Sequence, residues 1–169
     1  SESEETTKRI DCLMNVLSLE EKATNYDTMR HIERVRNLIN FFVLELLGRG
    51  EEHDQTKLEA PELPLFVEYT SKLAETTYGS PEYEEFRKKL KPALDHHYAK
   101  YRHHPEHFPD GIAGMNLIDL VELFVDWKAA SERHNDGNIL KSIEKNCTRF
   151  EMSPQLKKIF DNTAELFDS

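Results

Sequence analysis

Apolar residues recur at steps of three and four along most of the chain, which is the spacing of one face of an α-helix. The clearest case lies between residues 27 and 47, where a helix can begin at an N-cap, Asp27 or Thr28, and end at Gly48 or Gly50. Its apolar face is made by Ile32, Val35, Leu38, Ile39, Phe42, Val43 and Leu46.

The same spacing predicts further helices over residues 62–77, from Pro81 onward, from Asn116 onward, and over residues 139–147 and 154–167. Ser80 precedes Pro81 and is suited to cap that helix, whereas Pro92 inside it predicts a kink or a break. The prolines and glycines of "HHPEHFPDGIAG" predict a loop. The first twenty residues are also amphipathic. Strand patterns are nearly absent, so we expect an all-α, single-domain helical bundle.

Charge and composition limit the partners. The chain carries 32 acidic and 22 basic residues and a net charge of −10, which disfavours nucleic acid as a main partner. No apolar run approaches the length of a membrane span, and the polar start does not resemble a secretion signal. Cys12 and Cys147 form no CxxC pair. We expect a cytoplasmic protein with reduced thiols and no membrane partner, and a homo-oligomer stays open.

Histidines are concentrated in one stretch, "DHHYAKYRHHPEHFPDG" at residues 95–111, which holds five of the eight in the chain. Histidine is the commonest protein ligand of transition metals and the usual proton carrier near neutral pH. His31 lies on the apolar face of its predicted helix, where a single histidine is more often a hydrogen-bonded core residue than a metal ligand. The stretch therefore indicates a metal site only if ligands elsewhere in the chain join it.

Two other positions offer such ligands. His53 and Asp54 are adjacent and supply a nitrogen and a carboxylate that can share one metal or bridge two, although the dipeptide alone is a weak signal. Asp126 lies among apolar neighbours, where a carboxylate needs a cation or a strong donor. A helix salt bridge from Lys128 or Arg133 would meet that need equally well.

Taken in order, His31, His53-Asp54, the histidines of residues 96–104 and Asp126 resemble the H…HD…H…H…D pattern of the HD-domain metal-dependent phosphohydrolase superfamily. "HDQTKLEAPE" is similar to the HDxxK…P segment of the HD-GYP phosphodiesterases, and "HHPEHFPDG" to their HHExxDG block, although "GIAG" stands where they have GYP. The ligand set also resembles that of myo-inositol oxygenase and related di-iron HD proteins.

The resemblance implies an HD-like metal-binding helical domain over residues 27–169, preceded by a helical extension at residues 1–26. It implies that one metal is held by His31, His53, Asp54 and Asp126, with Asp54 bridging to a second metal that is bound by one histidine of each doublet. We expect one or two divalent transition metal ions, Fe or Mn first, with Zn, Co and Ni compatible.

Within the doublets, His97 and His104 continue a helical stripe of apolar residues and are preferred over His96 and His103, provided that the chain bends near Arg102. Lys57 and Asp54 are the expected catalytic residues. Lys57 and Arg102 are the expected contacts to a phosphorylated small-molecule substrate. For Lys57 the alternative, of equal weight, is a solvated lysine without that role. Glu122 can orient a ligand imidazole.

Three functions remain open on the sequence. The expected one is a metal-dependent phosphohydrolase or phosphodiesterase acting on a nucleotide or other phosphate ester, because hydrolases dominate the superfamily that the chain resembles. The alternatives are an HD-type di-iron oxygenase acting on a small organic substrate, and a degenerate HD bundle used for binding or structure.

Overall fold

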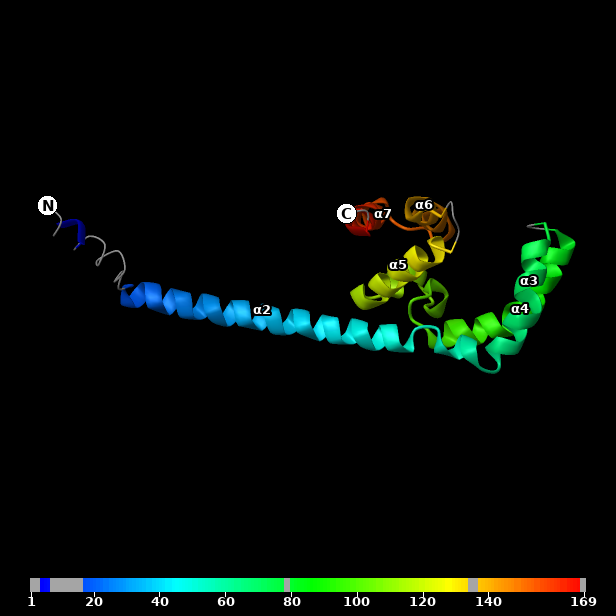
Figure 1. The fold of residues 1–169 in the computed structure, drawn as a ribbon, viewed down its shortest axis with the longest axis horizontal. Coiled ribbons are helices and arrows are strands. Elements are labelled where there is room, and N and C mark those ends of the chain that lie inside the picture. Colours follow the sequence, from blue (N-terminus) through cyan, green and yellow to red (C-terminus); the bar gives the residue numbers. More distant parts are fainter. Residues whose placement is uncertain (1–3, 7–16, 78–79, 134–136, 168–169) are drawn as a thin grey trace. The chain divides into compact units, whose positions relative to one another are not determined.

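The computed structural model describes residues 4–6, 17–77, 80–133 and 137–167. Within these ranges the chain forms helices and no strand, so the prediction of an all-α fold is confirmed (Figure 1). Most of the amphipathic pattern of the first twenty residues, with Cys12, lies outside the described residues. None of the described helices has both the length and the apolar character needed to cross a membrane.

Contacts within the chain group it into two units, residues 1–44 and 45–169. The boundary predicted after residue 26 falls inside the first unit. The second unit contains all the residues discussed below as a candidate site, with the exception of His31.

The first long helix, α2 (Leu19–Glu52), begins earlier and ends later than the sequence predicts. The prediction that Gly48 or Gly50 ends it is wrong, since both lie inside the helix. A glycine within a helix costs about 1 kcal/mol relative to alanine, but it stops the helix only when it takes a left-handed conformation. Here neither glycine has a positive φ, and the left-handed residue is Asp54, with φ of 57°. No residue of α2 is buried.

Two helices, α3 (Glu62–Glu75) and α4 (Pro81–Lys100), pack against each other. The predicted cap of α4 is confirmed, because the Ser80 hydroxyl accepts a hydrogen bond from the backbone N–H of Tyr83 at 3.1 Å. Pro92 does not break α4, which runs through it, so of the two predicted outcomes the break is wrong and the kink stays a prediction. Proline removes one backbone hydrogen bond, and the adjacent Ala93, fully buried, anchors the helix at that point.

The hydrophobic core of the second unit is formed by the last three helices, α5 (Leu117–Ser131), α6 (Ile139–Arg149) and α7 (Pro154–Ala164). The predicted cap at Asn116 is confirmed and forms a capping box with Asp119. Before α5, the predicted loop contains two short 3₁₀ turns, Pro105–His107 and Gly111–Gly114, and a third turn, Glu165–Phe167, follows α7. The buried core side chains are Leu123, Phe124, Trp127, Ile139, Ile143, Phe160 and Ala164.

Helix α5 therefore has two buried faces. One face carries the apolar core residues, and the other carries the carboxylates Asp119, Glu122 and Asp126 at steps of three and four. Asp119 and Glu122 are buried although they are acidic, so the structure must supply cationic or hydrogen-bonding partners for them. Those partners come from the end of α2, the end of α4 and the loop that follows it.

The core makes a simple prediction about stability. Ile143 is completely buried, whereas Leu140 on the same helix is 48% exposed. Ile143→Ala should lower the free energy of unfolding by about 2–5 kcal/mol, because it removes buried methyl groups and leaves a cavity. Leu140→Ala should change it by no more than about 0.5 kcal/mol. Urea denaturation of the two variants measures both, and equal losses would contradict the assigned core.

Candidate metal centre

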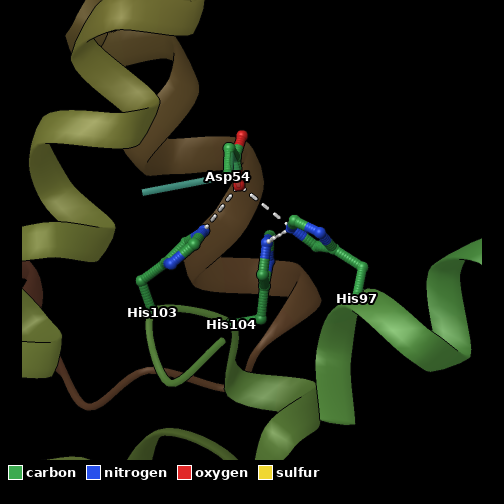
Figure 2. Close-up of side chains that lie close together, drawn as sticks. All are labelled: Asp54, His97, His103 and His104. Carbon is green, nitrogen blue, oxygen red and sulfur yellow. Dashed lines mark hydrogen bonds and ion pairs between the residues drawn. The ribbon is translucent and has the colours of Figure 1, made fainter. Parts of the chain in front are cut away.

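Five of the predicted ligands converge in the second unit, with one histidine that was not predicted. Three groups of side chains each bring their ligand atoms within 4.8 Å of one another. One of them, His53, His103 and Glu122, does not contain Asp54; the other two do, and they are called the ligand groups below. Asp54 belongs to both groups, so one carboxylate joins them. The first group, drawn in Figure 2, is Asp54, His97, His103 and His104, and the second is His53, Asp54 and Asp126.

A tight turn between α2 and the 3₁₀ turn Gln55–Leu58 places Asp54. Its backbone is left-handed, a conformation that aspartate tolerates better than most residues but that still carries strain. The turn is fixed to the end of α4 because the Tyr101 hydroxyl accepts a hydrogen bond from the Thr56 N–H at 2.9 Å. Asp54 and His97 are thereby held together from segments that are distant in sequence.

The distances around Asp54 are those expected between ligands of one ion. Its Oδ1 lies 3.0 Å from His97 Nε2 and 3.5 Å from His103 Nε2, and His97 Nε2 lies 3.0 Å from His104 Nε2. Ligand atoms at about 2.1 Å from a common cation are separated by about 3.0–3.4 Å for octahedral or tetrahedral angles. These three distances link His103, Asp54, His97 and His104 in turn, and one ligand atom from each of the four lies within 4.8 Å of the others.

Unsatisfied buried atoms support the same interpretation. Asp54 Oδ1 and His103 Nε2 are buried, and neither makes a hydrogen bond of good geometry among the described residues, although each has a charged or imidazole neighbour within 3.5 Å. Buried polar atoms nearly always have partners, and exceptions need an explanation. A divalent cation bound between these atoms would satisfy both, so the residues present fit a metal ion.

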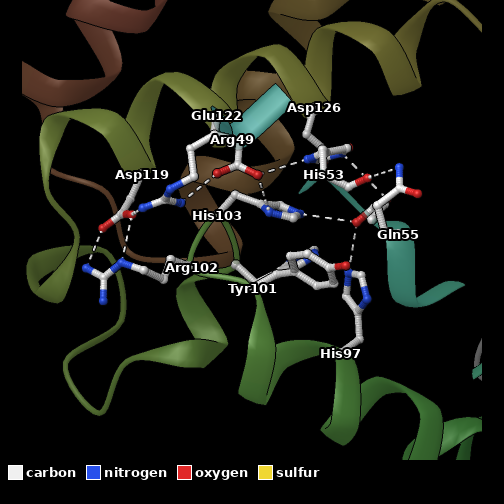
Figure 3. Close-up of polar contacts among 12 residues, drawn as sticks. Arg49, His53, Gln55, His97, Tyr101, Arg102, His103, Asp119, Glu122 and Asp126 are labelled. Carbon is white, nitrogen blue, oxygen red and sulfur yellow. Dashed lines mark hydrogen bonds and ion pairs between the residues drawn. The ribbon is translucent and has the colours of Figure 1, made fainter. Parts of the chain in front are cut away.

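Buried carboxylates hold the outer nitrogens of the histidines. Glu62, which is completely buried, lies 2.9 Å from His97 Nδ1. Glu122 lies 3.0 Å from His53 Nδ1 and 2.9 Å from His103 Nδ1, as Figure 3 shows. With each Nδ1 facing a carboxylate, the Nε2 atoms of all three rings face Asp54. This orientation is typical of metal-ligating histidines, whose second nitrogen is usually held by a carboxylate or a carbonyl group.

Two arginines neutralise the carboxylates of α5. Arg49 donates hydrogen bonds to Glu122 and to Asp119, each at 2.7 Å. Arg102 donates two hydrogen bonds to Asp119, at 3.0 and 2.8 Å. Arg102 was predicted to contact substrate, and in the structure its guanidinium is engaged with Asp119 and lies 4.8 Å above the ring of Phe108. Its arrangement is that of a residue which fixes the loop after α4 to α5.

Protonation differs among the histidines. Burial, followed by the charges of His103 and His97, lowers the pKa of His104 to about 3, so its imidazole is neutral and able to bind a cation. Hydrogen bonds to Asp126 and then Glu122 raise the pKa of His53 to about 10. A metal ion that binds His53 must therefore displace a proton, which is the usual coupling between metal binding and pH.

The carboxylates remain ionised at neutral pH. Burial raises the pKa of Asp54, but bonds from His103, His97 and Lys57 outweigh it and hold the pKa well below its ordinary value. Burial likewise opposes ionisation of Glu122, and contacts with His103 and His53 bring its pKa down to about 2. The centre thus contains anionic oxygens and nitrogen donors together, a set suited to transition metal ions.

Lys57 lies at the edge of this centre. Its Nζ donates to Asp54 Oδ2 at 2.6 Å, and its side chain is 38% exposed. The ammonium lies 5.9 Å from the ring of Phe66, which limits where the side chain can go. Lys57 is therefore a cation in contact with both the shared carboxylate and solvent.

His31 and His103 differ from the sequence-based expectation. His31 is exposed on α2 in the first unit and belongs to neither ligand group, so its role as a ligand stays a prediction. His103 was rejected in favour of His104 on helical spacing, but α4 ends at Lys100 and the spacing no longer applies beyond it. The structure brings in both members of that doublet. Pro105 directly after it was the signal that the helix would not continue.

The doublet at residues 96 and 97 provides a matched pair for testing the centre. Both histidines bond to Glu62 through Nδ1, but His97 is buried with Nε2 beside Asp54, whereas the His96 side chain is 43% exposed. His97→Ala should weaken metal binding by at least about tenfold, because it removes a ligand. His96→Ala should leave it within about twofold.

The measurement is the Mn²⁺ or Zn²⁺ affinity of each variant by isothermal titration, with metal content by elemental analysis. Unfolding midpoints serve as the control for an intact fold. Equal weakening in both variants would show that Glu62, rather than the ligand position of His97, explains the loss. Unchanged binding in His97→Ala would remove it from the centre.

Comparison with known proteins identifies the family to which the chain belongs. No curated protein and no solved structure matches the chain. One family model matches residues 20–166, a range that includes all members of both ligand groups, Glu62, Glu122 and Lys57. The chain therefore belongs to this family, which is described as a family of unknown function (DUF5662).

Proposed function

We propose that the protein is an HD-type, metal-dependent phosphohydrolase with two cations that share Asp54. The observation that carries the proposal is the convergence of His53, Asp54, Asp126 and the histidines at 97, 103 and 104 into two adjoining ligand groups. These residues follow the order of the HD superfamily pattern from its HD pair onward, whereas its first histidine, His31, is not among them. Asp54 is the residue that these two ligand groups share, as a bridging ligand must be.

The proposed metals follow from the donors. The first group offers three imidazoles and one carboxylate, and the second offers one imidazole and two carboxylates. Imidazole-rich sites favour Fe, Mn, Zn, Co or Ni over Mg, which prefers oxygen ligands. Two such cations would polarise a phosphoryl oxygen and lower the pKa of a bound water, which is the usual contribution of paired metals to ester hydrolysis.

The protein's own residues would orient the reacting groups. Glu62 and Glu122 hold the imidazole rings so that their Nε2 atoms face Asp54. Lys57 is the cationic side chain in direct contact with Asp54 and partly open to solvent, so it is placed to pair with a phosphate oxygen. The two nearby arginines are already neutralised by Asp119 and Glu122.

The net charge of −10 does not argue against an anionic substrate. Local charge is set by the ions within a site, and two divalent cations with Lys57 would outweigh the carboxylates that hold them. The acidic remainder of the chain would weaken long-range attraction of phosphates without changing their binding at the centre.

The function is tested by an assay without oxygen. The protein, loaded with Mn²⁺ under strict anaerobiosis, should release phosphate from nucleotides, sugar phosphates or generic phosphate esters. Lys57→Ala should lower kcat/KM by about 10- to 100-fold, because a charged hydrogen bond contributes about 1.5–3 kcal/mol. Its metal content should not change, since an ammonium cannot bind a metal.

Lys72 supplies the matched control. It is also a lysine on the second unit that is paired with a carboxylate, Glu68, but it lies on α3 outside the ligand groups. Lys72→Ala should retain wild-type activity. No turnover of any ester in the panel, together with an iron-loaded protein that consumes oxygen, would contradict the proposal and favour a di-iron oxygenase.

A further inference from the structure

A cavity of about 250 Å³ adjoins the candidate metal centre. His104 and Asp126, one ligand from each group, form part of its wall. The rest of the wall comes from α4, α5 and α6 and includes Tyr98, Trp127, Ser142 and Asn146. Three larger hollows of about 330, 710 and 1090 Å³ are lined by none of the candidate ligands. The smaller cavity is thus the one that a molecule bound at the centre would extend into.

The part of the wall that α6 contributes is polar, with Ser142 and Asn146 bonded to each other. Asn146 donates from Nδ2 to the backbone oxygen of Ser142 at 3.0 Å, which fixes the amide and leaves its Oδ1 as an acceptor. Ser142 adds a hydroxyl on the preceding turn of α6. A ligand with several hydroxyl groups would find both donors and acceptors here.

An aromatic pair forms a rigid side of the cavity. The rings of Trp127 and Phe150 stack almost parallel, at 7° and a centroid distance of 6.2 Å, and both line the cavity. At its edge, Arg149 donates to Glu106 at 2.7 Å, so the two charges there compensate each other. The cavity therefore offers no unpaired charge to a ligand except at the metal centre itself.

The size of the cavity limits what it can hold. A volume of about 250 Å³ lies just below the 300–1,000 Å³ that is typical of pockets for drug-sized ligands. A hollow of this size is suited to a single polar ring of pentose or hexose size.

We propose that this cavity binds the organic part of the substrate and that the substrate is the phosphate ester of a single sugar-sized polyol. The phosphate would lie at the His104 and Asp126 end, and the hydroxyl groups would face Asn146 and Ser142. The inference rests on the proposed function for the position of the phosphate. The inference goes beyond the proposed function because it names the class of substrate and the residues that select this substrate.

Trp127 allows the inference to be tested without turnover. It is the single tryptophan of the chain and lines the cavity, so its emission reports directly on what enters. The probe is a pentose phosphonate, in which carbon replaces the ester oxygen and blocks hydrolysis. It is titrated into the Zn²⁺-loaded protein, and inorganic phosphate is titrated in parallel.

The phosphonate should change Trp127 emission in a saturable way and bind more tightly than inorganic phosphate. Asn146→Leu should weaken it by about tenfold, since the amide is lost and the cavity is partly filled. Ser142→Ala, a milder change, should weaken it about threefold. Both variants should bind inorganic phosphate as the wild type does. Thr148→Ala, an exposed polar position on the same helix, is the matched control and should change nothing.

Wild-type affinity in both Asn146→Leu and Ser142→Ala would overturn the inference, as would phosphonate binding with no response of Trp127. The proposed function fails separately. Phosphonate binding as expected without hydrolysis of any ester would leave the cavity assignment and remove the hydrolase. Hydrolysis with an unchanged kcat/KM in both cavity variants would support the hydrolase and remove the cavity assignment.

Discussion

The side chain of Asp54 is the contact on which the candidate site depends. It belongs to both ligand groups, and it also accepts from Lys57. Three separate segments meet at this one carboxylate: the turn after α2, the end of α4 with its loop, and α5. Its left-handed backbone is what turns the chain out of α2 so that the carboxylate faces the histidines. Strain of this kind persists only where the surrounding contacts enforce it, and here the Thr56–Tyr101 bond does so.

A layer of buried acids around the histidines gives the site its orientation. Glu62 and Glu122 would be costly to bury in isolation, by several kcal/mol each. Imidazoles and an arginine compensate their charges. Glu62 contacts His96 and His97. Glu122 contacts Arg49, His53 and His103. Without a cation, the proton on His53 supplies part of the positive charge that the cluster requires. A bound metal would replace that proton, so the same groups stabilise the fold and prepare the site.

The sequence predicted the helices well where local signals decide them. Caps at Ser80 and Asn116 act within one turn of the chain, and both form as expected. The glycines were misjudged, because Gly48 and Gly50 end a helix only in a left-handed conformation that neither adopts here. Pro92 does not break α4, although it removes one backbone hydrogen bond. The candidate ligands His53, Asp54 and Asp126 could be selected from their order, and His97 and His104 from a helical stripe within the two doublets. His103 could not, since choosing between adjacent histidines requires knowing where α4 ends, and Glu62 carried no signal because its role depends on the packing of α3 against α4.

The central claim is that two cations are bound on either side of Asp54, and anomalous X-ray diffraction tests it most directly. Crystals of the full chain grown with Mn²⁺, measured near the manganese edge, should show two strong anomalous peaks per chain. One should be bounded by His97, His103 and His104, the other by His53 and Asp126, with Asp54 in contact with both. Peaks at other residues, or no ordered peak at saturating Mn²⁺, would contradict the claim.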